Sequence, residues 1–538
     1  MAKRLIKDKA FELREWQQEA FRNVTTAAVQ GQKDFLCVAT PGAGKTKLAL
    51  TVAHYFLKEK YCERVVVVTP SDQLKRQWSW EAAEFAGIDL DPDYSNSQGI
   101  EVSDFHGVAI TYALLGQDKK AVHAQNTFNK KTFVIFDEIH HAGESLTWGN
   151  AVKNSFENAV FRLAISGTAF RSDDAQIPFI TYENKVSVAD YTYSYERAIR
   201  ENVCRPVYFT IHEGQMKWKV GAQEFEHTFK DSLAPDQVSK RLKTALDPKG
   251  NWVRDVLKDA DRKLSEIRQT HHNAAGLVFA ATQRHAQELA KVVEKITGEI
   301  PPVVISSDDD GSEKIQAFKN GNGRWLVSVR MVSEGVDIPR LRVGVYLTII
   351  KSELYFRQAV GRFVRVLKSL QSQDAFIFIP QDKDIVKLAE TIQLERDHAL
   401  DDADRKAGAA DGLPTDLFGN EYTPALQGKF TMLGSEATDS KTIAVNVEIT
   451  SGAKHGVDTR RAPQNTDPVY LQKERLRESI NMIAKRYAIK QTNGNRNIKP
   501  DFKALHKIWR EQGGKEMHLE TIEELNKRLQ FFQSKLRV

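Results

Sequence analysis

A glycine-rich segment, ATPGAGKT at residues 39–46, follows a short apolar run and precedes an apolar helical stretch. A glycine-rich turn between a strand and a helix lets backbone N–H groups and the helix N-terminus surround phosphate oxygens. We expect Gly42 and Gly44 to allow the tight turn, and Lys45 to bind the β- and γ-phosphates. The Thr46 hydroxyl would ligate Mg²⁺. A chance Gly-Lys-Thr in a loop is the alternative, but the flanking strand and helix favour nucleotide binding.

Two adjacent carboxylates, Asp137 and Glu138, end the apolar run TFVIFDE further along the chain. Carboxylates at the carboxyl edge of a parallel strand lie beside a phosphate loop when the two strands are neighbours. Asp137 would then hold Mg²⁺ through its waters, and Glu138 would orient or deprotonate an attacking water. In isolation such a pair is an ordinary strand end, but downstream of a phosphate loop it favours hydrolysis of a nucleotide.

Two histidines, His140 and His141, follow directly. Adjacent side chains of a strand point to opposite faces, so these two would make a poor pair of metal ligands. We instead expect His140 to link the nucleotide to a second domain.

A later segment, QAVGRFVR at residues 358–365, carries Gln358, Arg362 and Arg365. Their spacing of i, i+4 and i+7 predicts that they share one face of a helix. Two guanidinium groups presented to a γ-phosphate across a cleft would stabilise the charge of the transition state as arginine fingers. An amphipathic helix with exposed arginines is the alternative. Gly361 weakens a helix by ~1 kcal/mol relative to alanine, which favours a close approach at this point.

The elements that would position these residues are visible as two series of short β-branched and aliphatic runs with amphipathic stretches between them. The first series is 34–40, 64–69, 132–138 and 161–167, and the second is 276–282, 301–307, 324–330, 342–348 and 374–380. This pattern predicts buried parallel strands joined by helices, and so an α/β chain with two similar domains in tandem.

The rest of the chain divides by composition. We expect a first domain over 1–205, a connector with limited structure of its own over 206–275, a second domain over 276–385, a helical stretch and polar linker over 386–467, and a basic helical module over 468–538. The linker is inferred from its Gly, Thr, Ser and Asp content. The module is inferred from renewed helical periodicity.

The excess of positive over negative side chains is concentrated near the C-terminus. The 538 residues include 77 Lys and Arg against 71 Asp and Glu, and 41% are hydrophobic, which excludes a collagen-like, low-complexity or wholly disordered chain. Residues 471–538 alone hold 16 Lys and Arg against 8 Asp and Glu. Such a stripe could neutralise phosphates, but a solvated helix face has the same composition and is favoured on charge alone.

No apolar run approaches the ~18 residues of a membrane-spanning helix. Charge interrupts every apolar stretch of MAKRLIKDKAFELREW at the N-terminus, so we expect no export signal and a cytoplasmic or nucleoid-associated protein. The three cysteines, Cys37, Cys62 and Cys204, have no paired spacing, so neither a disulfide framework nor a cysteine zinc site is indicated.

In this order the motifs resemble those of the superfamily 2 DNA and RNA helicases. The resemblance is greatest to the DEAD/DEAH-box branch that contains the helicase subunits of restriction enzymes and the Rad25-like DNA helicases. LREWQQEAF at 13–21 resembles the upstream adenine-reading motif, which implies that Gln17 pairs with the adenine edge and that Arg14 supports it.

The remaining motifs follow along the chain. They are VVVVTPSDQLKRQW at 65–78 (motif Ia), ITYALL at 110–115 (the next strand-contacting motif), DEIH at 137–140 (motif II), SGTAFR at 166–171 (motif III), GLVFAATQRHAQELA at 276–290 (motif IV), VSVRMVSEGVDIP at 327–339 (motif V) and QAVGRFVR at 358–365 (motif VI). Seven individually weak patterns in a fixed order are jointly specific. One departure is Ala359, where many relatives have arginine.

The resemblance implies roles for residues that the spacing alone does not assign. Ser166 and Thr168 of motif III would couple the state of ATP to nucleic acid. Gly335 and Asp337 of motif V would sense the nucleotide, while Ser333 would face the strand. Both domains would be RecA-like, and the helical C-terminal extension would follow them.

The implied function is an ATP-dependent DNA helicase or translocase that uses ATP and Mg²⁺ between two RecA-like domains and moves along single-stranded or duplex DNA. Three alternatives stay open: a translocase subunit of a restriction, defence or remodelling complex without unwinding, an RNA helicase, and a nucleotide-gated binding protein with a vestigial ATPase. RNA is less favoured than DNA, no membrane partner is expected, and a protein partner could bind the C-terminal module.

Overall fold

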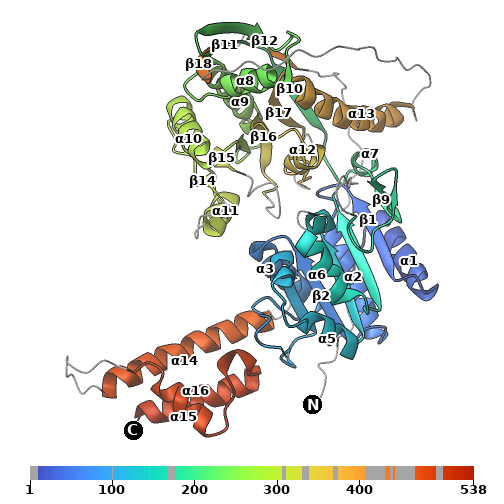
Figure 1. Cartoon of the computed structure of the whole chain (residues 1–538), viewed down its shortest axis with the longest axis vertical. Helices are drawn as coiled ribbons and strands as arrows, with labels where there is room; N and C mark the ends of the chain where they lie inside the picture. Colours follow the sequence, from blue (N-terminus) through green and yellow to red (C-terminus); the bar gives the residue numbers. More distant parts are fainter. Residues whose placement is uncertain are drawn as a thin grey trace. The chain divides into compact units, whose positions relative to one another are not determined.

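The computed structural model (Figure 1) describes residues 6, 10–99, 101–143, 146–167, 176–305, 311–329, 338–367, 373–405, 430–436, 440–442, 467–491 and 501–537. The chain forms two compact units. The first consists of Met1–Val38, Gly44–Thr192 and Ala453–Val538, and the second of Ala39–Ala43 and Tyr193–Gly452. The first unit therefore ends earlier than the predicted boundary at residue 205, and it includes the C-terminal helices.

A seven-stranded sheet forms the centre of the first unit, in the order β3-β4-β2-β5-β6-β1-β9. The strands are β1 (Asp34–Ala39), β2 (Arg64–Thr69), β3 (Leu90–Asp91), β4 (Gly107–Thr111), β5 (Thr132–Asp137), β6 (Phe161–Ser166) and β9 (Tyr191–Tyr193). The pairs from β3 to β1 are all parallel. All four predicted strands are present, and they are buried almost throughout because helices cover both faces of such a sheet.

Helices connect these strands (Figure 1). They are α1 (Glu15–Val29), α2 (Lys45–Lys58), α3 (Asp72–Glu81), α4 (Tyr112–Gly116), α5 (Val122–Asn129) and α6 (Leu146–Phe156), and a hairpin of β7 (Tyr182–Glu183) and β8 (Val186–Ser187) follows them. Helices α3 and α4 begin after Ser71 and Thr111, whose hydroxyls accept a hydrogen bond from the backbone N–H of the residue three positions on. These caps fix where both helices start.

The predicted C-terminal helices are present as α14 (Val469–Gln491), α15 (Ala504–Glu511) and α16 (Ile522–Arg537). They have a hydrophobic core of their own, which includes Ile480, Leu505, Leu525 and Phe532. The module contacts the rest of the first unit through acidic residues. Asp104 accepts a hydrogen bond of 2.8 Å from the Ile522 backbone N–H and lies 3.3 Å from the Lys473 ammonium group. This basic module is thus anchored by charge pairing.

A second seven-stranded sheet, in the order β14-β15-β13-β16-β17-β10-β19, forms the centre of the second unit. Its strands are β10 (Val207–His212), β13 (Ala275–Ala280), β14 (Val303–Val304), β15 (Trp325–Ser328), β16 (Leu341–Leu347), β17 (Ala375–Pro380) and β19 (Ser440–Thr442). All five strands of the predicted second series are among them. The helices of this unit are α7 (Tyr195–Arg200), α8 (Pro235–Ala245), α9 (Asn251–Arg268), α10 (Gln283–Thr297), α11 (Gly311–Asn320), α12 (Glu353–Val360) and α13 (Lys383–Arg405).

We predicted a connector with limited structure of its own over 206–275, but this range is an integral part of the second unit. Strand β10 lies in the main sheet beside β17. Strand β11 (Gln215–Val220) pairs with both β12 (Gln223–Thr228) and β18 (Phe430–Glu436) in a separate three-stranded sheet. Strands β18 and β19 also lie inside the range predicted as a linker. The partner strands are far apart in sequence, so local composition could not reveal the pairing.

Among the described residues, no helix has the length and apolar character needed to span a bilayer. All three cysteines are free and buried. Burial raises the pKa of the Cys37 and Cys62 thiols to about 12, so both remain protonated and unreactive at neutral pH.

Candidate nucleotide-binding site

The two glycines of the phosphate loop adopt the left-handed backbone conformation, with φ of +83° at Gly42 and +97° at Gly44. Residues with a Cβ atom rarely adopt this conformation. A Cβ atom at Gly44 would also lie 3.0 Å from the Gln17 side-chain nitrogen, tighter than most real contacts. Gly44 immediately precedes α2, so the loop ends at the amino end of that helix, a position that favours anion binding because the first N–H groups of a helix lack intrahelical partners.

The upstream motif lies against this loop. The Gln17 side chain accepts a hydrogen bond of 2.9 Å from the Arg14 backbone N–H and donates one of 2.9 Å to the Gly44 carbonyl. The Arg14 guanidinium is also near Gly44, 3.5 Å from where a Cβ atom would stand. The structure therefore brings Arg14 and Gln17 to the loop, while their expected contact with adenine stays a prediction.

Glu138 lies at the centre of the polar contacts around the loop. Its carboxylate is 3.5 Å from the Lys45 ammonium group, and it accepts hydrogen bonds of 3.1 Å from the Gly167 backbone N–H and 3.4 Å from the Ser166 hydroxyl. Its own φ is +47°, which is uncommon for a residue other than glycine. Backbone strain of this kind is concentrated at functional sites.

The charge state of Glu138 follows from these neighbours. Burial by itself would raise the pKa of the carboxyl group, but Lys45, His140 and the Gly167 N–H outweigh it and lower the pKa to about 2. Glu138 is therefore ionised at neutral pH, and Lys45 is its strongest stabilising partner.

Asp137 is held by aromatic residues from two other motifs. The Trp78 indole N–H on α3 donates a hydrogen bond of 2.7 Å to the Asp137 carboxylate, and the Tyr112 hydroxyl on α4 donates one of 3.0 Å to its backbone carbonyl. Both aromatic side chains are buried. Sequence reasoning missed these contacts, although both residues lie in segments that we matched to strand-contacting motifs.

One geometric assumption about the acidic pair is wrong. Strand β6 lies between β1 and β5, so the strand that ends in Asp137 is not the neighbour of the strand that leads into the loop. The intervening strand ends at Ser166, beside Glu138 and His140. The extra strand thus inserts motif III between the loop and the carboxylates.

We predicted that His140 and His141 lie in a strand, and this prediction is wrong. They lie in a 3₁₀ turn, Ile139–Gly143, with ring centroids 4.5 Å apart. His140 Nδ1 is 3.4 Å from the Ser166 hydroxyl and 3.6 Å from the Glu138 carboxylate. Among the described residues, no group of three His, Cys, Asp or Glu side chains could hold a metal ion.

The helical face predicted for motif VI is also wrong. Helix α12 ends at Val360, so Arg362 and Arg365 lie beyond it, and only Gln358 is helical. A Cβ atom at Gly361 would overlap Pro41, so the chain is closely packed where the helix stops. The Arg362 guanidinium donates a hydrogen bond of 3.4 Å to the Gln358 carbonyl. The backbone of Arg365 forms an isolated antiparallel β-bridge with that of Cys204.

Four residues that were expected to act at the site lie outside the described residues. They are Thr168 of motif III, and Ser333, Gly335 and Asp337 of motif V. Their expected roles stay predictions. Thr46 is described and lies in the first turn of α2, directly after Lys45, where its hydroxyl would reach a metal ion on the phosphates.

Comparison with known proteins decides the family. The family model described as Type III restriction enzyme, res subunit, matches residues 10–171, and the model of the helicase conserved C-terminal domain matches residues 259–367. An uncharacterized protein of Mycobacterium tuberculosis (strain CDC 1551 / Oshkosh) is 41% identical over 433 residues, which cover 79% of this chain and 71% of that protein. The chain belongs to the superfamily 2 helicases, in the branch of the restriction-enzyme helicase subunits.

Two further similarities agree with this family. The chain is 26% identical over 394 residues to a protein of Sulfurisphaera tokodaii named DNA 3'-5' translocase XPB2, covering 67% of this chain and 80% of that one. A fragment from Vibrio vulnificus YJ016, named as an HsdR subunit of a type I restriction enzyme, superposes with a TM-score of 0.50 at 16% identity, covering 70% of this chain and 65% of that fragment. This second likeness shows the fold alone and agrees with two parallel-sheet domains.

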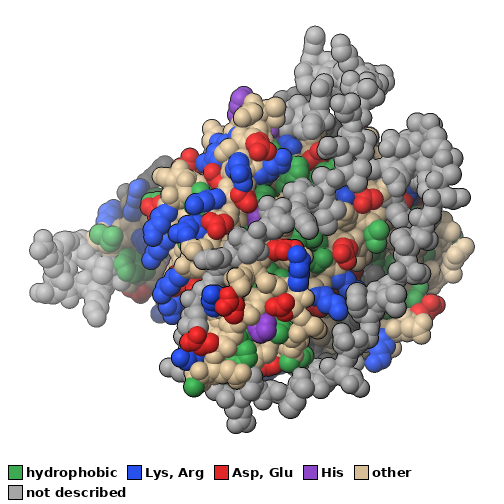
Figure 2. All heavy atoms as spheres, turned by 90° about the horizontal axis from the view of Figure 1, so that it is seen from above, with side chains coloured by type: hydrophobic (Ala, Val, Ile, Leu, Met, Phe, Trp, Pro, Cys, Tyr) green, Lys and Arg blue, Asp and Glu red, His purple; other side chains and the backbone are tan. Residues whose placement is uncertain are grey.

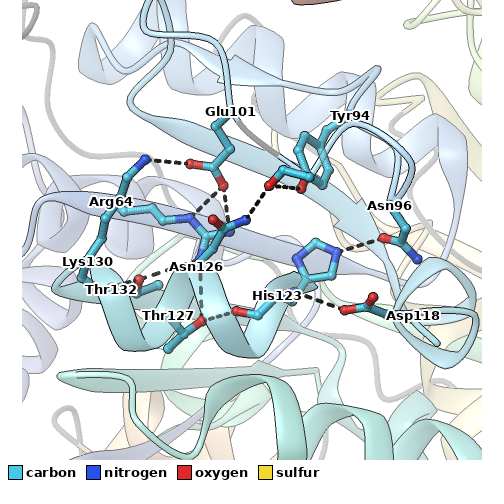
Figure 3. A network of polar contacts seen from close by, with 11 residues as sticks. Arg64, Tyr94, Asn96, Glu101, Asp118, His123, Asn126, Thr127, Lys130 and Thr132 are labelled. Atoms are coloured by element: carbon cyan, nitrogen blue, oxygen red, sulfur yellow. Dashed lines mark hydrogen bonds and ion pairs between the residues drawn. The ribbon is translucent and has the colours of Figure 1, made fainter. Parts of the chain in front are cut away.

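A second polar network in the first unit supports the helicase sheet rather than the site (Figure 3). At the amino end of β2 the buried Arg64 guanidinium donates a hydrogen bond of 2.6 Å to Glu101, which also pairs with Lys130 at 3.4 Å. Burial would raise the pKa of Glu101, but Arg64 outweighs it and the pKa is lowered. The phosphate loop and Glu138 follow the carboxyl ends of their strands, so this network occupies the opposite edge of the sheet.

Proposed function

We propose that this superfamily 2 helicase is an ATP-dependent DNA translocase with ATP and Mg²⁺ as cofactors. The observation that carries the proposal is the arrangement of Lys45 and the Gly167 backbone N–H around the Glu138 carboxylate. This cluster lies beside a loop whose glycines adopt the left-handed conformation. An ionised carboxylate, a lysine and a helix amino end are the groups that ATP hydrolysis needs at the γ-phosphate.

The donor set fits Mg²⁺. Thr46 and Asp137 offer oxygen ligands of the type that Mg²⁺ prefers, and the Trp78 indole fixes the Asp137 carboxylate in orientation. When bound, the metal would neutralise charge on the phosphate oxygens. The resemblance of their segment to the adenine-reading motif would put Arg14 and Gln17 at the adenine, and Gln17 already donates a hydrogen bond to the Gly44 carbonyl.

Lys45 and Glu138 have a further consequence for proton transfer. With a pKa of about 2, Glu138 is ionised but is a weak base. A phosphate group that drew Lys45 away would remove the strongest influence that lowers the pKa. Glu138 would then accept a proton from the attacking water more readily, so ATP binding itself would activate the base.

Motif III and motif VI would convert hydrolysis into movement. Ser166 contacts both Glu138 and His140, so a change at the γ-phosphate would reach the segment that follows β6. Gln358, Arg362 and Arg365 would supply the transition-state contacts from the second RecA-like domain. Loss of those contacts after hydrolysis would release the closed state and advance the strand.

DNA is the proposed track because the similar protein of Sulfurisphaera tokodaii is named a DNA 3'-5' translocase. A translocase subunit of a restriction complex that does not unwind its duplex is the second candidate, because one matching family model is described as Type III restriction enzyme, res subunit. In Figure 2 the Lys and Arg side chains on the visible face lie among Asp and Glu rather than in one uniform patch.

The proposal is tested by ATP hydrolysis in the presence of single-stranded DNA, duplex DNA and RNA of equal length, with phosphate release as the readout. We expect the largest stimulation with DNA. Triplex displacement on a duplex then separates translocation from unwinding, which is measured on a forked substrate. Equal rates with and without every nucleic acid would refute the motor and favour a vestigial ATPase.

A further inference from the structure

The segment after α7 is joined to motif VI inside the second unit. The Arg205 backbone N–H donates a hydrogen bond of 2.8 Å to the Val364 carbonyl, and Cys204 forms the antiparallel bridge with Arg365. The buried Tyr195 hydroxyl donates a hydrogen bond of 2.9 Å to the Arg205 carbonyl. Residues 204–205 are therefore held on both sides, and the backbone around Arg365 is held with them.

The Arg205 side chain extends this connection to the end of motif V. It is 1% exposed, and its Nη2 donates a hydrogen bond of 2.6 Å to the Pro339 carbonyl. Pro339 is the last residue of the segment that matches motif V. Arg205 thus contacts motif VI through its backbone and motif V through its guanidinium group.

A contribution to stability does not explain why the Arg205 guanidinium is buried. Its Nε and Nη1 have no hydrogen-bond partner among the described residues, and burying unpaired donors of a charged group opposes folding. An apolar side chain of similar volume is often at least as stabilising as a buried charge. Burial and the nearby Arg342 lower the pKa of Arg205 to about 9, so the group stays charged at neutral pH despite this cost.

We propose that Arg205 is a positioning residue that sets the place of motif VI relative to motif V. It would hold the turn at Val364 and Arg365 at a fixed distance from Pro339, and so would fix where the two motif VI guanidinium groups can reach. The inference rests on the proposed function of those arginines. Residues of this kind act through others, and a displacement of about 1 Å at reacting groups can lower a rate by on the order of 100-fold.

The test compares Arg205→Met with Arg205→Lys and with a matched control, Arg241→Met. Arg241 is also buried in the second unit, also has an unpaired Nε, and donates to two backbone carbonyls, Thr228 and Asp231, at 2.6 and 2.8 Å. The control therefore removes the same chemistry from a site whose backbone partners lie outside motifs V and VI.

We expect Arg205→Met to lower kcat for DNA-stimulated ATP hydrolysis by about 10- to 100-fold with little change in the KM for ATP. Arg205→Lys should recover part of the rate because an ammonium group can still donate to Pro339. Arg241→Met should keep the kcat of the parent protein. A folded Arg205→Met protein with parental kcat, or with a raised KM alone, would overturn the proposal.

A second readout does not depend on ATP hydrolysis. Hydrogen exchange of the full chain should become faster at residues 359–365 in Arg205→Met but not in Arg241→Met. If the parent protein showed no ATPase activity stimulated by nucleic acid, the proposed function would fail. The exchange measurement would still test whether Arg205 positions motif VI. Unchanged exchange at these residues would refute the positioning role, and if Arg205→Met did not fold, Arg205→Lys would be measured in the same way.

Discussion

The Trp78–Asp137 hydrogen bond gives the most specific prediction from the structure. Trp78→Phe keeps an aromatic ring in a buried position but removes the indole N–H that donates 2.7 Å to the Asp137 carboxylate. A hydrogen bond to a charged group contributes about 1.5–3 kcal/mol. Since each ~1.4 kcal/mol corresponds to a factor of ten, the full effect at Asp137 would be about 10- to 100-fold.

The assay is DNA-stimulated ATP hydrolysis at increasing Mg²⁺. If Asp137 holds the metal, Trp78→Phe should raise the half-saturating Mg²⁺ concentration by about tenfold or more, because an untethered carboxylate must be reoriented for every ligand. The matched control is Trp80→Phe on the same helix, since Trp80 is 49% exposed. Indistinguishable Mg²⁺ curves for the two variants would show that the hydrogen bond does not orient Asp137.

Three further predictions follow from the same unit. Lys45→Ala or Glu138→Gln should abolish ATP hydrolysis while nucleic-acid binding, measured by filter retention, stays largely intact; full hydrolysis by either variant would overturn the assignment of the site. Glu138 has a lowered pKa in the folded state, so its contribution to stability is present above its ordinary pKa and is lost as the pH falls toward about 2. The free energy of unfolding of the parent protein should exceed that of Glu138→Gln by at most about 3 kcal/mol (~1.4 kcal/mol per pKa unit). Urea titrations should show this difference shrinking as the pH is lowered from 5.5 to 3.5. A difference that stayed constant would contradict the electrostatic account. Lys473→Met removes a buried ammonium group from the partly exposed Asp104 and should destabilise the docking of the C-terminal module by about 1 kcal/mol, seen as faster proteolysis of the module; the exposed-pair variant Lys527→Met is the control, and equal cleavage of the two would count against the anchor.

Much of the fold could be predicted because the strands of both parallel sheets are buried on two faces. Runs such as RVVVVT at 64–69 and DAFIFIP at 374–380 have few polar residues, and this is visible without any partner strand. The strands that were missed, such as β12 and β18, alternate or are short, and both are stabilised by pairing with β11, which β18 reaches across a long separation in sequence.

The sequence also determined which groups are available at the site. A glycine loop, a lysine, an acidic pair and a late arginine motif lie in an order that identifies the superfamily 2 helicases, and the loop conformation requires glycine whatever surrounds it. The tertiary structure decided which of these groups touch. Strand β6 places Ser166 between the loop strand and the acidic strand, and this order depends on hydrogen bonds between strands far apart in the chain.

The end of α12 shows the same division. The spacing of Gln358, Arg362 and Arg365 is compatible with a helix, and local propensity alone would continue it. The helix stops at Val360, and the turn that follows is closely packed against Pro41 and paired with Cys204 and Arg205. Side-chain packing and hydrogen bonding from distant segments therefore decided where the arginines lie, because local propensity is worth less than the tertiary contacts that oppose it.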